Sequence, residues 1–469
     1  MVLSNLEPKS VFRFFEELCR IPHGSGNTAA ASAWAEAFAR ERGLRCRRDE
    51  AGNVVIWKAA SAGYEDHPAV MLQGHLDMVC VAGPGVAHDF TRDPLELEVD
   101  GGWVRAKGTT LGGDDGIAVA MVIALLDDGA VPHPPLEAVL TVDEEVGMLG
   151  ATALDGSDLR ARYLLNIDSE EEGVLTVGCA GGARCDLTGT FPAAPGGGVV
   201  CTLTVSGLQG GHSGVDINKG RANANKLLAE CLDQLPGLRL ISLRGGAQDN
   251  AIPGSAEAVF LLPAGAWEDY RPSVRPDPEL EPHFSCAFAA AGGCGGPALS
   301  EEDSRRVVRL LLDAPNGIQS MEPDLPGQVR TSLNLGVMRL EAGELSLTWS
   351  VRSSDAGEKE ALIARLEALA GSAGGSFSRR GEYPAWPYRK DSPLRETMVR
   401  VFRRLYGREP KVETIHAGLE CGILADKVPG LDAVSFGPQM VDIHSDRERM
   451  SVESVQRTWE YLREVLGEL

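Results

Sequence analysis

Residues 69–79 read AVMLQGHLDMV, an apolar run that ends in a histidine and an aspartate. Three other short runs have the same apolar character: VVIWK at 54–58, LEAVLTV at 136–142 and RYLLNI at 162–167. Short strands that are apolar at nearly every position are typical of a parallel or mixed sheet whose two faces are both covered by helices. These runs therefore predict an α/β fold.

Helix-like segments flank these strands, and the composition changes in the middle of the chain. Amphipathic or apolar helices are predicted at 10–21, 28–43 and 117–129, and the same style returns after residue 388. Between them lie glycine-rich stretches, alternating strands and two more helices. We therefore expect one discontinuous domain over 1–182 and 383–469, with helices on both faces of a mixed sheet, and an inserted α+β domain over 183–382.

Composition excludes several classes of protein. The 469 residues suit two or three domains, and 45 Lys and Arg against 67 Asp and Glu give a net charge of −22. Nucleic acids and anionic membranes both favour a basic face, so we expect neither as a partner. We see no signal peptide, and the longest relevant apolar run, Gly116–Leu126, is too short to span a bilayer. Ten scattered cysteines without a CxxC pair suggest free thiols in a cytoplasmic protein.

Acidic and histidine side chains gather where the predicted strands end. They are His75 and Asp77, Asp114 and Asp115 at the start of a helix, Glu144 and Glu145, Asp168, and His444. Ligands of open α/β sheets bind beyond the carboxyl ends of strands, so these groups should meet in one cleft. Several carboxylates at close range cannot all stay ionised without a cation, and histidine with carboxylates suits Zn²⁺, Mn²⁺ or Co²⁺. The sequence therefore predicts a metal centre.

The spacing of these residues along the chain suggests a separate role for each. His75 and Asp77 are two residues apart, so on an extended segment they point to one side, and Asp77 can orient the imidazole. Glu144 and Glu145 are neighbours, which diverge in a strand, so one can bind metal while the other acts as general base. Each feature alone is ordinarily structural, as an N-cap or a turn. Their combination at successive strand ends favours the metal centre.

Six motifs carry a resemblance that runs nearly end to end. GHLDMV, GTTLGGDDG, VDEEVGMLGA, LLNIDSEEEG, GGHSGVDI and FGPQMVDIHSDRE resemble the dizinc metallopeptidase family of carnosinase and peptidase T. HAGLECG and EYPAWPY are typical of its Xaa-His dipeptidase branch, also called aminoacyl-histidine or cytosolic non-specific dipeptidase. The resemblance implies hydrolysis of unblocked dipeptides by two divalent ions per subunit, Zn²⁺ first and Mn²⁺ or Co²⁺ as alternatives.

The resemblance also implies a role for each residue of the metal centre. His75 and Asp168 would hold one metal, Glu145 and His444 the other, and Asp114 would bridge them, with a cis bond between Asp114 and Asp115. Glu144 would act as general base on a metal-bridging water, and Asp77 would orient His75.

The inserted domain is implied to be a lid and a dimerisation domain. His212 in GGHSG would stabilise the oxyanion in a neighbouring subunit's site, which makes the protein a homodimer. Asn250 in DNAIP would contact the substrate, Arg352 in SVRSS would bind its terminal carboxylate, and Glu420 would read its amino group. The glycine-rich stretch 289–300 matches no feature of the family.

Other functions remain open at this point. A tripeptidase or an N-acyl amino acid deacylase could use the same scaffold, because fold and metal site do not fix the substrate. A related single-domain aminopeptidase is disfavoured because Asp168 and His444 are 276 positions apart in the chain. A catalytically silent binding protein should have lost the base or a ligand, and all are present. A nucleotide-dependent dehydrogenase lacks its GxGxxG after the first strand.

Overall fold

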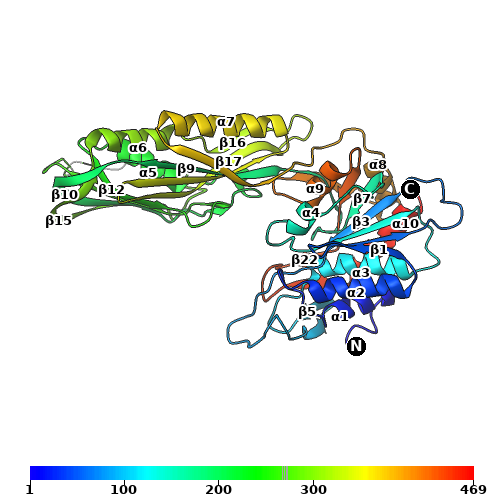
Figure 1. Ribbon diagram of the computed structural model, residues 1–469. Helices are drawn as coiled ribbons and strands as arrows, with labels where there is room; N and C mark the ends of the chain where they lie inside the picture. The colour runs from blue at the N-terminus through cyan, green and yellow to red at the C-terminus, as the bar shows by residue number, and fades with distance from the viewer. Residues whose placement is uncertain (267, 269, 271–272) are drawn as a thin grey trace. The chain divides into compact units, whose positions relative to one another are not determined.

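The structure, a computed structural model, describes residues 1–266, 268, 270 and 273–469 and divides into two compact units (Figure 1). The first comprises Met1–Cys179, Trp386–Thr414 and Leu419–Leu469, and the second comprises Ala180–Ala385 and Ile415–Gly418. Each unit has its own hydrophobic core. No helix among the described residues has both the length and the apolar character needed to cross a membrane.

The first unit is built on an eight-stranded mixed sheet. Its order is β1 (Arg45–Arg48), β2 (Val54–Lys58), β6 (Leu136–Thr141), β3 (Val70–His75), β7 (Tyr163–Asn166), β21 (Asp432–Ser435), β8 (Val174–Cys179) and β20 (Lys411–Ile415). Strands β6, β3, β7 and β21 run parallel to one another. A second sheet has the order β22 (Met440–Val441), β23 (Arg449–Ser451), β5 (Trp103–Ala106) and β4 (Leu97–Asp100). The predicted α/β class with a mixed sheet is confirmed.

Helices bury this sheet. They are α1 (Lys9–Leu18), α2 (Ala29–Glu41), α3 (Gly113–Asp127), α4 (Leu149–Ala153), α8 (Pro393–Tyr406), α9 (Glu420–Lys427) and α10 (Val452–Leu466). Figure 1 shows α1, α2 and α3 as a layer against one face of the sheet, with α4 and α9 away from that layer. Every residue of α3 from Gly113 to Leu126 is buried, as expected of a helix that is apolar all round.

The second unit has an antiparallel nine-stranded sheet. Its order is β15 (Ser285–Leu299), β10 (Ala193–Ser206), β14 (Ala256–Leu262), β12 (Arg239–Gly245), β17 (Val329–Glu341), β18 (Glu344–Ser353), β9 (Gly181–Thr190) and β19 (Ser376–Tyr383), with β16 (Gly317–Met321) beside β17. Helices α5 (Ala224–Asp233), α6 (Glu301–Asp313) and α7 (Ala356–Ser372) lie on one side of it in Figure 1. A two-stranded sheet pairs β11 (Gly211–His212) with β13 (Ala251–Ile252).

The glycine-rich stretch 289–300 lies almost entirely within strand β15. Its backbone pairs with β10, and the register shifts between Gly196 and Val199 and again at Val200. Glycine ordinarily weakens a strand, because it has no side chain to pack. Backbone pairing along this edge strand therefore overrides the composition.

Candidate active site

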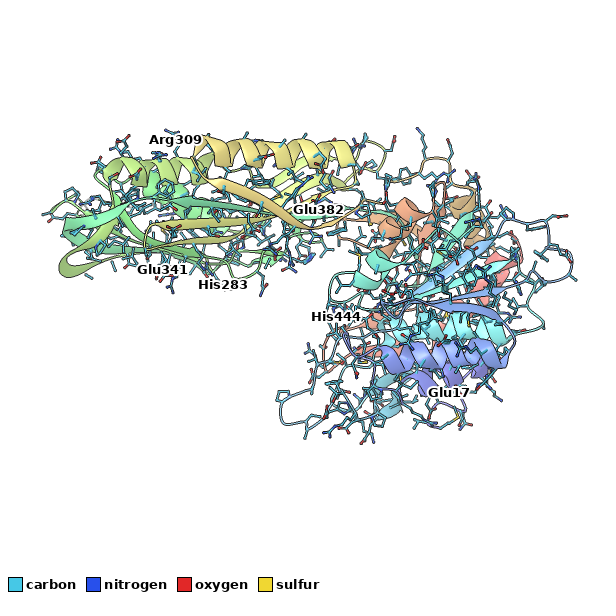
Figure 2. The ribbon with its side chains drawn as sticks, viewed as in Figure 1. Glu17, His283, Arg309, Glu341, Glu382 and His444 are labelled. Carbon is cyan, nitrogen blue, oxygen red and sulfur yellow. The ribbon has the colours of Figure 1, made fainter. Side chains whose placement is uncertain are left out.

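Three neighbouring strands bring the predicted site residues together. His75 is the last residue of β3, while Glu144 and Glu145 follow β6 and Asp168 follows β7. These three strands are parallel and adjacent, so their carboxyl ends meet at one edge of the sheet. Asp114 lies in the first turn of α3, and His444 lies in a loop after β22 (Figure 2).

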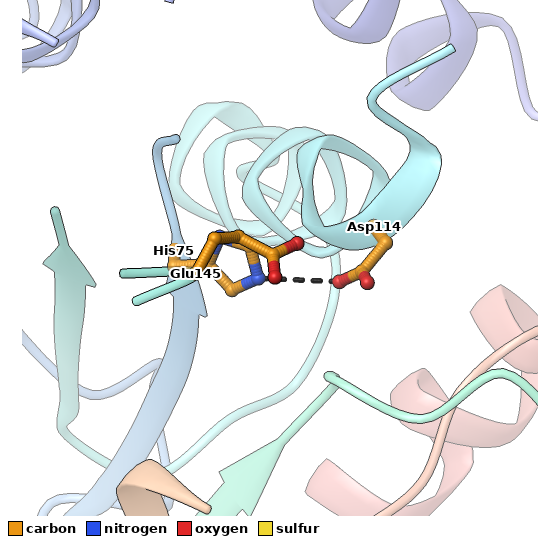
Figure 3. Close-up of side chains that lie close together, drawn as sticks. All are labelled: His75, Asp114 and Glu145. Carbon is orange, nitrogen blue, oxygen red and sulfur yellow. Dashed lines mark hydrogen bonds and ion pairs between the residues drawn. The ribbon is translucent and has the colours of Figure 1, made fainter. Parts of the chain in front are cut away.

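The five predicted metal ligands form a continuous series of contacts centred on Asp114. His75 Nε2 lies 3.2 Å from Asp114 Oδ1, and His444 Nε2 lies 3.1 Å from Asp114 Oδ2. At the two ends, Asp168 Oδ1 lies 3.7 Å from His75 Nε2, and Glu145 Oε1 lies 2.9 Å from His444 Nε2. Figure 3 shows His75, Asp114 and Glu145 converging. Each oxygen of Asp114 therefore faces a different histidine.

The local backbone is shaped to present Asp114. Gly112 has φ 67°, a left-handed conformation that glycine adopts without steric cost, and the bond between Asp114 and Asp115 is cis, as the resemblance implies. A Cβ on Gly74 would lie 2.7 Å from Asp115 Oδ2, so only glycine fits there. Asp115 Oδ2 in turn accepts a hydrogen bond from the backbone N–H of His75 at 3.2 Å. The loop before α3 and the end of β3 are thereby joined.

Asp77 connects His75 to the turn that carries both glutamates. Its Oδ1 lies 3.3 Å from His75 Nδ1, and the Asp77 carbonyl oxygen lies 3.0 Å from the same nitrogen. The backbone N–H groups of Glu144 and Glu145 donate to the Asp77 carboxylate at 3.0 and 3.3 Å. Ser25 Oγ donates to it at 2.8 Å, a contact that the sequence did not indicate.

The sequence predicts Glu144 and Glu145 as neighbours in a strand, but the structure places them outside any strand. Strand β6 ends at Thr141, and Asp143 has φ 55°, so the chain has left the extended conformation before it reaches them. The Asp77 carboxylate holds this turn, because it accepts hydrogen bonds from the backbone N–H groups of both glutamates.

Negative charge is concentrated here, and the pKa values reflect it. Burial raises the pKa of Glu144 to about 8, and the nearby Glu420 and Glu145 carboxyls add to the effect. Burial likewise raises the pKa of Asp168 well above its usual range. Hydrogen bonds to Asp114 and Glu145 raise the pKa of His444 to about 10. The raised pKa values show that these carboxyls resist being ionised side by side. A bound cation would offset the repulsion between the carboxylates.

The donor set and its spacing fit divalent metal ions. Ligand atoms of His75, Asp114 and Glu145 all lie within 4.8 Å of one another, as do those of His75, Asp115 and Asp168. Two atoms bound at about 2.0–2.2 Å to one ion are at most roughly 4.4 Å apart, and the contacts above are closer. Asp115 Oδ1 is also buried without a hydrogen-bond partner. Sequence reasoning gave Asp115 no metal role, although the structure groups it with Asp168.

Glu420, predicted to read the substrate's amino group, is fully buried at the start of α9. Its Oε2 accepts hydrogen bonds from Gln73 Nε2 at 2.5 Å and Thr141 Oγ1 at 2.6 Å, and its Oε1 has no partner. Burial raises its pKa to about 7. Asn166 Nδ2 also donates to Gln73 Oε1, so a polar network that the sequence did not reveal lies among these strand ends.

His212, in the second unit, has a fixed tautomer. Its Nδ1 accepts hydrogen bonds from the backbone N–H groups of Gly214 and Val215, both at 3.2 Å. Burial lowers its pKa, and the nearby Arg352 lowers it further, so the ring is neutral at pH 7 and carries its proton on Nε2. His212 can therefore donate one hydrogen bond through Nε2. Asn250 is exposed next to β13, which pairs with the strand of His212.

Arg352 is a buried cation without an anionic partner. It is 7% exposed on β18, and its Nη1 donates to the Tyr383 hydroxyl at 2.9 Å. Its Nε has no hydrogen-bond partner, and no carboxylate of the described residues forms an ion pair with it. An unpaired buried charge is costly, so this geometry favours an anionic ligand.

His416 is a polar residue near Arg352 that the sequence reasoning did not single out. Its Nε2 lies 2.8 Å from Ser332 Oγ, and burial lowers its pKa to about 3, with a further contribution from Arg352. A Cβ on Gly214 would lie 2.3 Å from the His416 carbonyl oxygen, so the segment passes directly against the His212 turn. His416 is therefore neutral, so it brings no negative charge that would pair with Arg352.

Comparison with known proteins adds an independent line. The sequence profile of peptidase family M20/M25/M40 matches residues 71–468. The cytosol non-specific dipeptidase of Escherichia coli K12 is 38% identical, and the alignment covers 100% of this chain and 99% of that protein.

Solved structures agree with this. Aminoacylhistidine dipeptidase from Vibrio alginolyticus superimposes with a TM-score of 0.91 at 36% identity, covering 100% of this chain and 98% of that one. Aminopeptidase PepT from Bacillus cereus superimposes with a TM-score of 0.58 at 17% identity, covering 99% of both chains, a likeness of fold alone.

Proposed function

The chain belongs to peptidase family M20/M25/M40, and on that premise we propose that it hydrolyses unblocked dipeptides, Xaa-His dipeptides among them. It is a metal-dependent peptidase. The observation that carries the proposal is the placement of Asp114, whose two carboxylate oxygens each face a histidine at 3.1–3.2 Å. One carboxylate between two ligand groups is the arrangement that a two-metal site requires.

In this proposal two divalent ions, Zn²⁺ or else Mn²⁺ or Co²⁺, bind to the five residues centred on Asp114. His75 and Asp168 would hold one ion, Glu145 and His444 would hold the other, and Asp114 would be shared. Bound ions would supply Lewis acidity and would lower the pKa of a water molecule near the peptide bond. Asp77 keeps His75 in place through Nδ1.

Glu144 is proposed as the group that moves the proton. Its carboxyl is largely buried beside Glu145, and its backbone is held by Asp77. A carboxylate in this place can accept a proton from the attacking water and, once protonated, deliver it to the leaving amine. Glu144 therefore carries the proton from the attacking water to the nitrogen of the leaving amine.

The second unit is proposed to recognise the ends of the dipeptide. Arg352 has an unused Nε donor and no ion pair among the described residues, so it suits the terminal carboxylate. His212 donates through Nε2 to the carbonyl oxygen as charge develops on it. Asn250 contacts the substrate backbone, and Glu420, which belongs to the first unit, reads the amino group. A homodimer formed through the inserted domain and a cytoplasmic location belong to the same proposal.

A substrate panel with defined metals tests this function. Metal-stripped protein should cleave nothing, and added Zn²⁺, Mn²⁺ or Co²⁺ should restore cleavage of Xaa-His and other free dipeptides. Tripeptides have their charged ends too far apart, and N-acylated amino acids lack the charged amino group, so both should be cleaved at least about tenfold more slowly. Faster cleavage of tripeptides would make the protein a tripeptidase, and faster cleavage of N-acyl amino acids would make it a deacylase. Full activity in excess chelator would contradict a metal mechanism.

A further inference from the structure

Glu448 is a buried carboxylate that the mechanism above does not use. It is 3% exposed, and its side chain is surrounded by backbone N–H groups. Its Oε2 accepts from Leu111 at 2.8 Å and Gly112 at 3.2 Å, and its Oε1 accepts from Gly113 at 2.8 Å and Asp114 at 3.4 Å. One carboxylate therefore binds four consecutive backbone N–H groups, the last of which belongs to Asp114.

The loop before α3 is built so that these groups converge. Gly112 is in the left-handed conformation, and Asp114 and Asp115 depart from helical geometry. A Cβ on Gly113 would lie 3.2 Å from Glu448 Oε1 and 3.1 Å from Met440 Sδ, which is tighter than ordinary contact. The exposed N–H groups at a helix start favour an anion. Here a side chain of the protein fills that position.

Glu448 also closes the turn that carries His444. Its backbone N–H donates to the Ser445 carbonyl oxygen at 3.1 Å, and the next residue begins β23, which pairs with both β22 and β5. Asp442 and His444 have φ values of 56° and 60°, a left-handed conformation that is uncommon for residues other than glycine. Glu448 thus belongs to the His444 turn, and its carboxylate also accepts hydrogen bonds from the Asp114 loop.

We propose that Glu448 is a positioning residue that fixes the Asp114 loop against the His444 turn, and so sets the spacing of the proposed metal ligands. This inference rests on the proposed function, because it concerns the same metal centre. Outer residues that orient ligands typically change metal affinity by 10- to 100-fold when they are replaced. Glu448 acts only through the backbone N–H groups that it binds, so it touches neither metal nor substrate.

The test compares Glu448→Gln with Glu137→Gln in the full-length protein. Glutamine keeps the shape of the side chain, but its NH₂ group faces two backbone N–H donors and cannot accept from them. Glu137 is a matched control: it is 4% exposed, and it accepts from the Arg160 and Ala161 N–H groups near the start of β6, at the opposite end of that strand from the site. Both substitutions disturb a buried carboxylate bound to backbone N–H groups.

The readouts are the dissociation constant for Zn²⁺, measured by titrating metal-stripped protein against a chromogenic chelator, and thermal unfolding of the metal-free form. Glu448→Gln should bind Zn²⁺ about 10- to 100-fold more weakly, and Glu137→Gln should stay within about twofold of the unsubstituted protein even if both unfold earlier. Unchanged affinity in Glu448→Gln, or equal losses in both variants, would overturn the inference.

Two further arms keep the test decisive. If Glu448→Gln does not fold, Gly113→Ala replaces it, because the added Cβ pushes on Glu448 Oε1 and should weaken Zn²⁺ binding in the same direction. Unchanged affinity in that variant would overturn the inference as well. Failure of the unsubstituted protein to bind metal would contradict the proposed function itself, whereas normal binding with an unaffected Glu448→Gln would contradict only the role of Glu448.

Discussion

Replacement of Glu144 by glutamine should lower kcat for dipeptide hydrolysis by about 10²- to 10⁴-fold, which is the usual contribution of a general base. Glutamine has nearly the same shape but cannot take up and release a proton. The backbone N–H of residue 144 would still donate to Asp77, so the turn should keep its geometry. The measurement is kcat under saturating metal, together with metal content per chain.

Glu145→Gln is the matched control, because it changes the adjacent residue in the same way. Glu145 contacts His444 at 2.9 Å, so its loss should release metal rather than lower kcat at saturating metal. Normal turnover in Glu144→Gln would exclude it as the base. If Glu145→Gln kept its metal but lost turnover, Glu145 would be the general base and Glu144 the metal ligand.

Asp114→Asn should have the largest effect on metal binding, a loss of about 100-fold or more, since even outer residues can cost that much. Asp114 is the only one of the five proposed ligands that contacts both His75 and His444, so its replacement disturbs both ion positions. An amide also brings N–H groups toward one of the histidines. The measurement is metal bound per chain after dialysis, by atomic emission.

Asp115→Asn provides the comparison for this prediction. Asp115 is its neighbour in the same loop, but its Oδ2 accepts from the His75 N–H, a role that an amide oxygen can still fill. Metal should therefore be retained better in Asp115→Asn than in Asp114→Asn. The reverse order would mean that the grouping of Asp115 with His75 and Asp168 marks the true ligand set.

The strands and their ends could be predicted because the information is local. The apolar runs at 54–58, 70–75, 136–141 and 163–166 are strands, and polar residues at the end of three of them, or just beyond it, meet at the sheet edge. Parallel strands place their carboxyl ends together whatever the rest of the chain does. The family resemblance then added the assignment of each residue to a role, which strand ends alone do not give.

The supporting residues could not be predicted, because each depends on contacts between distant segments. Glu448 lies in a charged stretch of sequence, yet it is buried against a loop more than 300 residues earlier. Ser25 and Gln73 are ordinary polar residues whose partners become known only in three dimensions. The strand at 285–299 was hidden for another reason, since its glycines carry no pattern of side chains.

Anomalous diffraction from crystals grown with Zn²⁺ or Mn²⁺ tests the central claim most directly. We predict two ions per chain, roughly 3.5–4 Å apart, with one Asp114 oxygen on each. His75 and Asp168 should complete one coordination shell, and Glu145 and His444 the other. A single ion, or ions bound away from Asp114, would contradict the account.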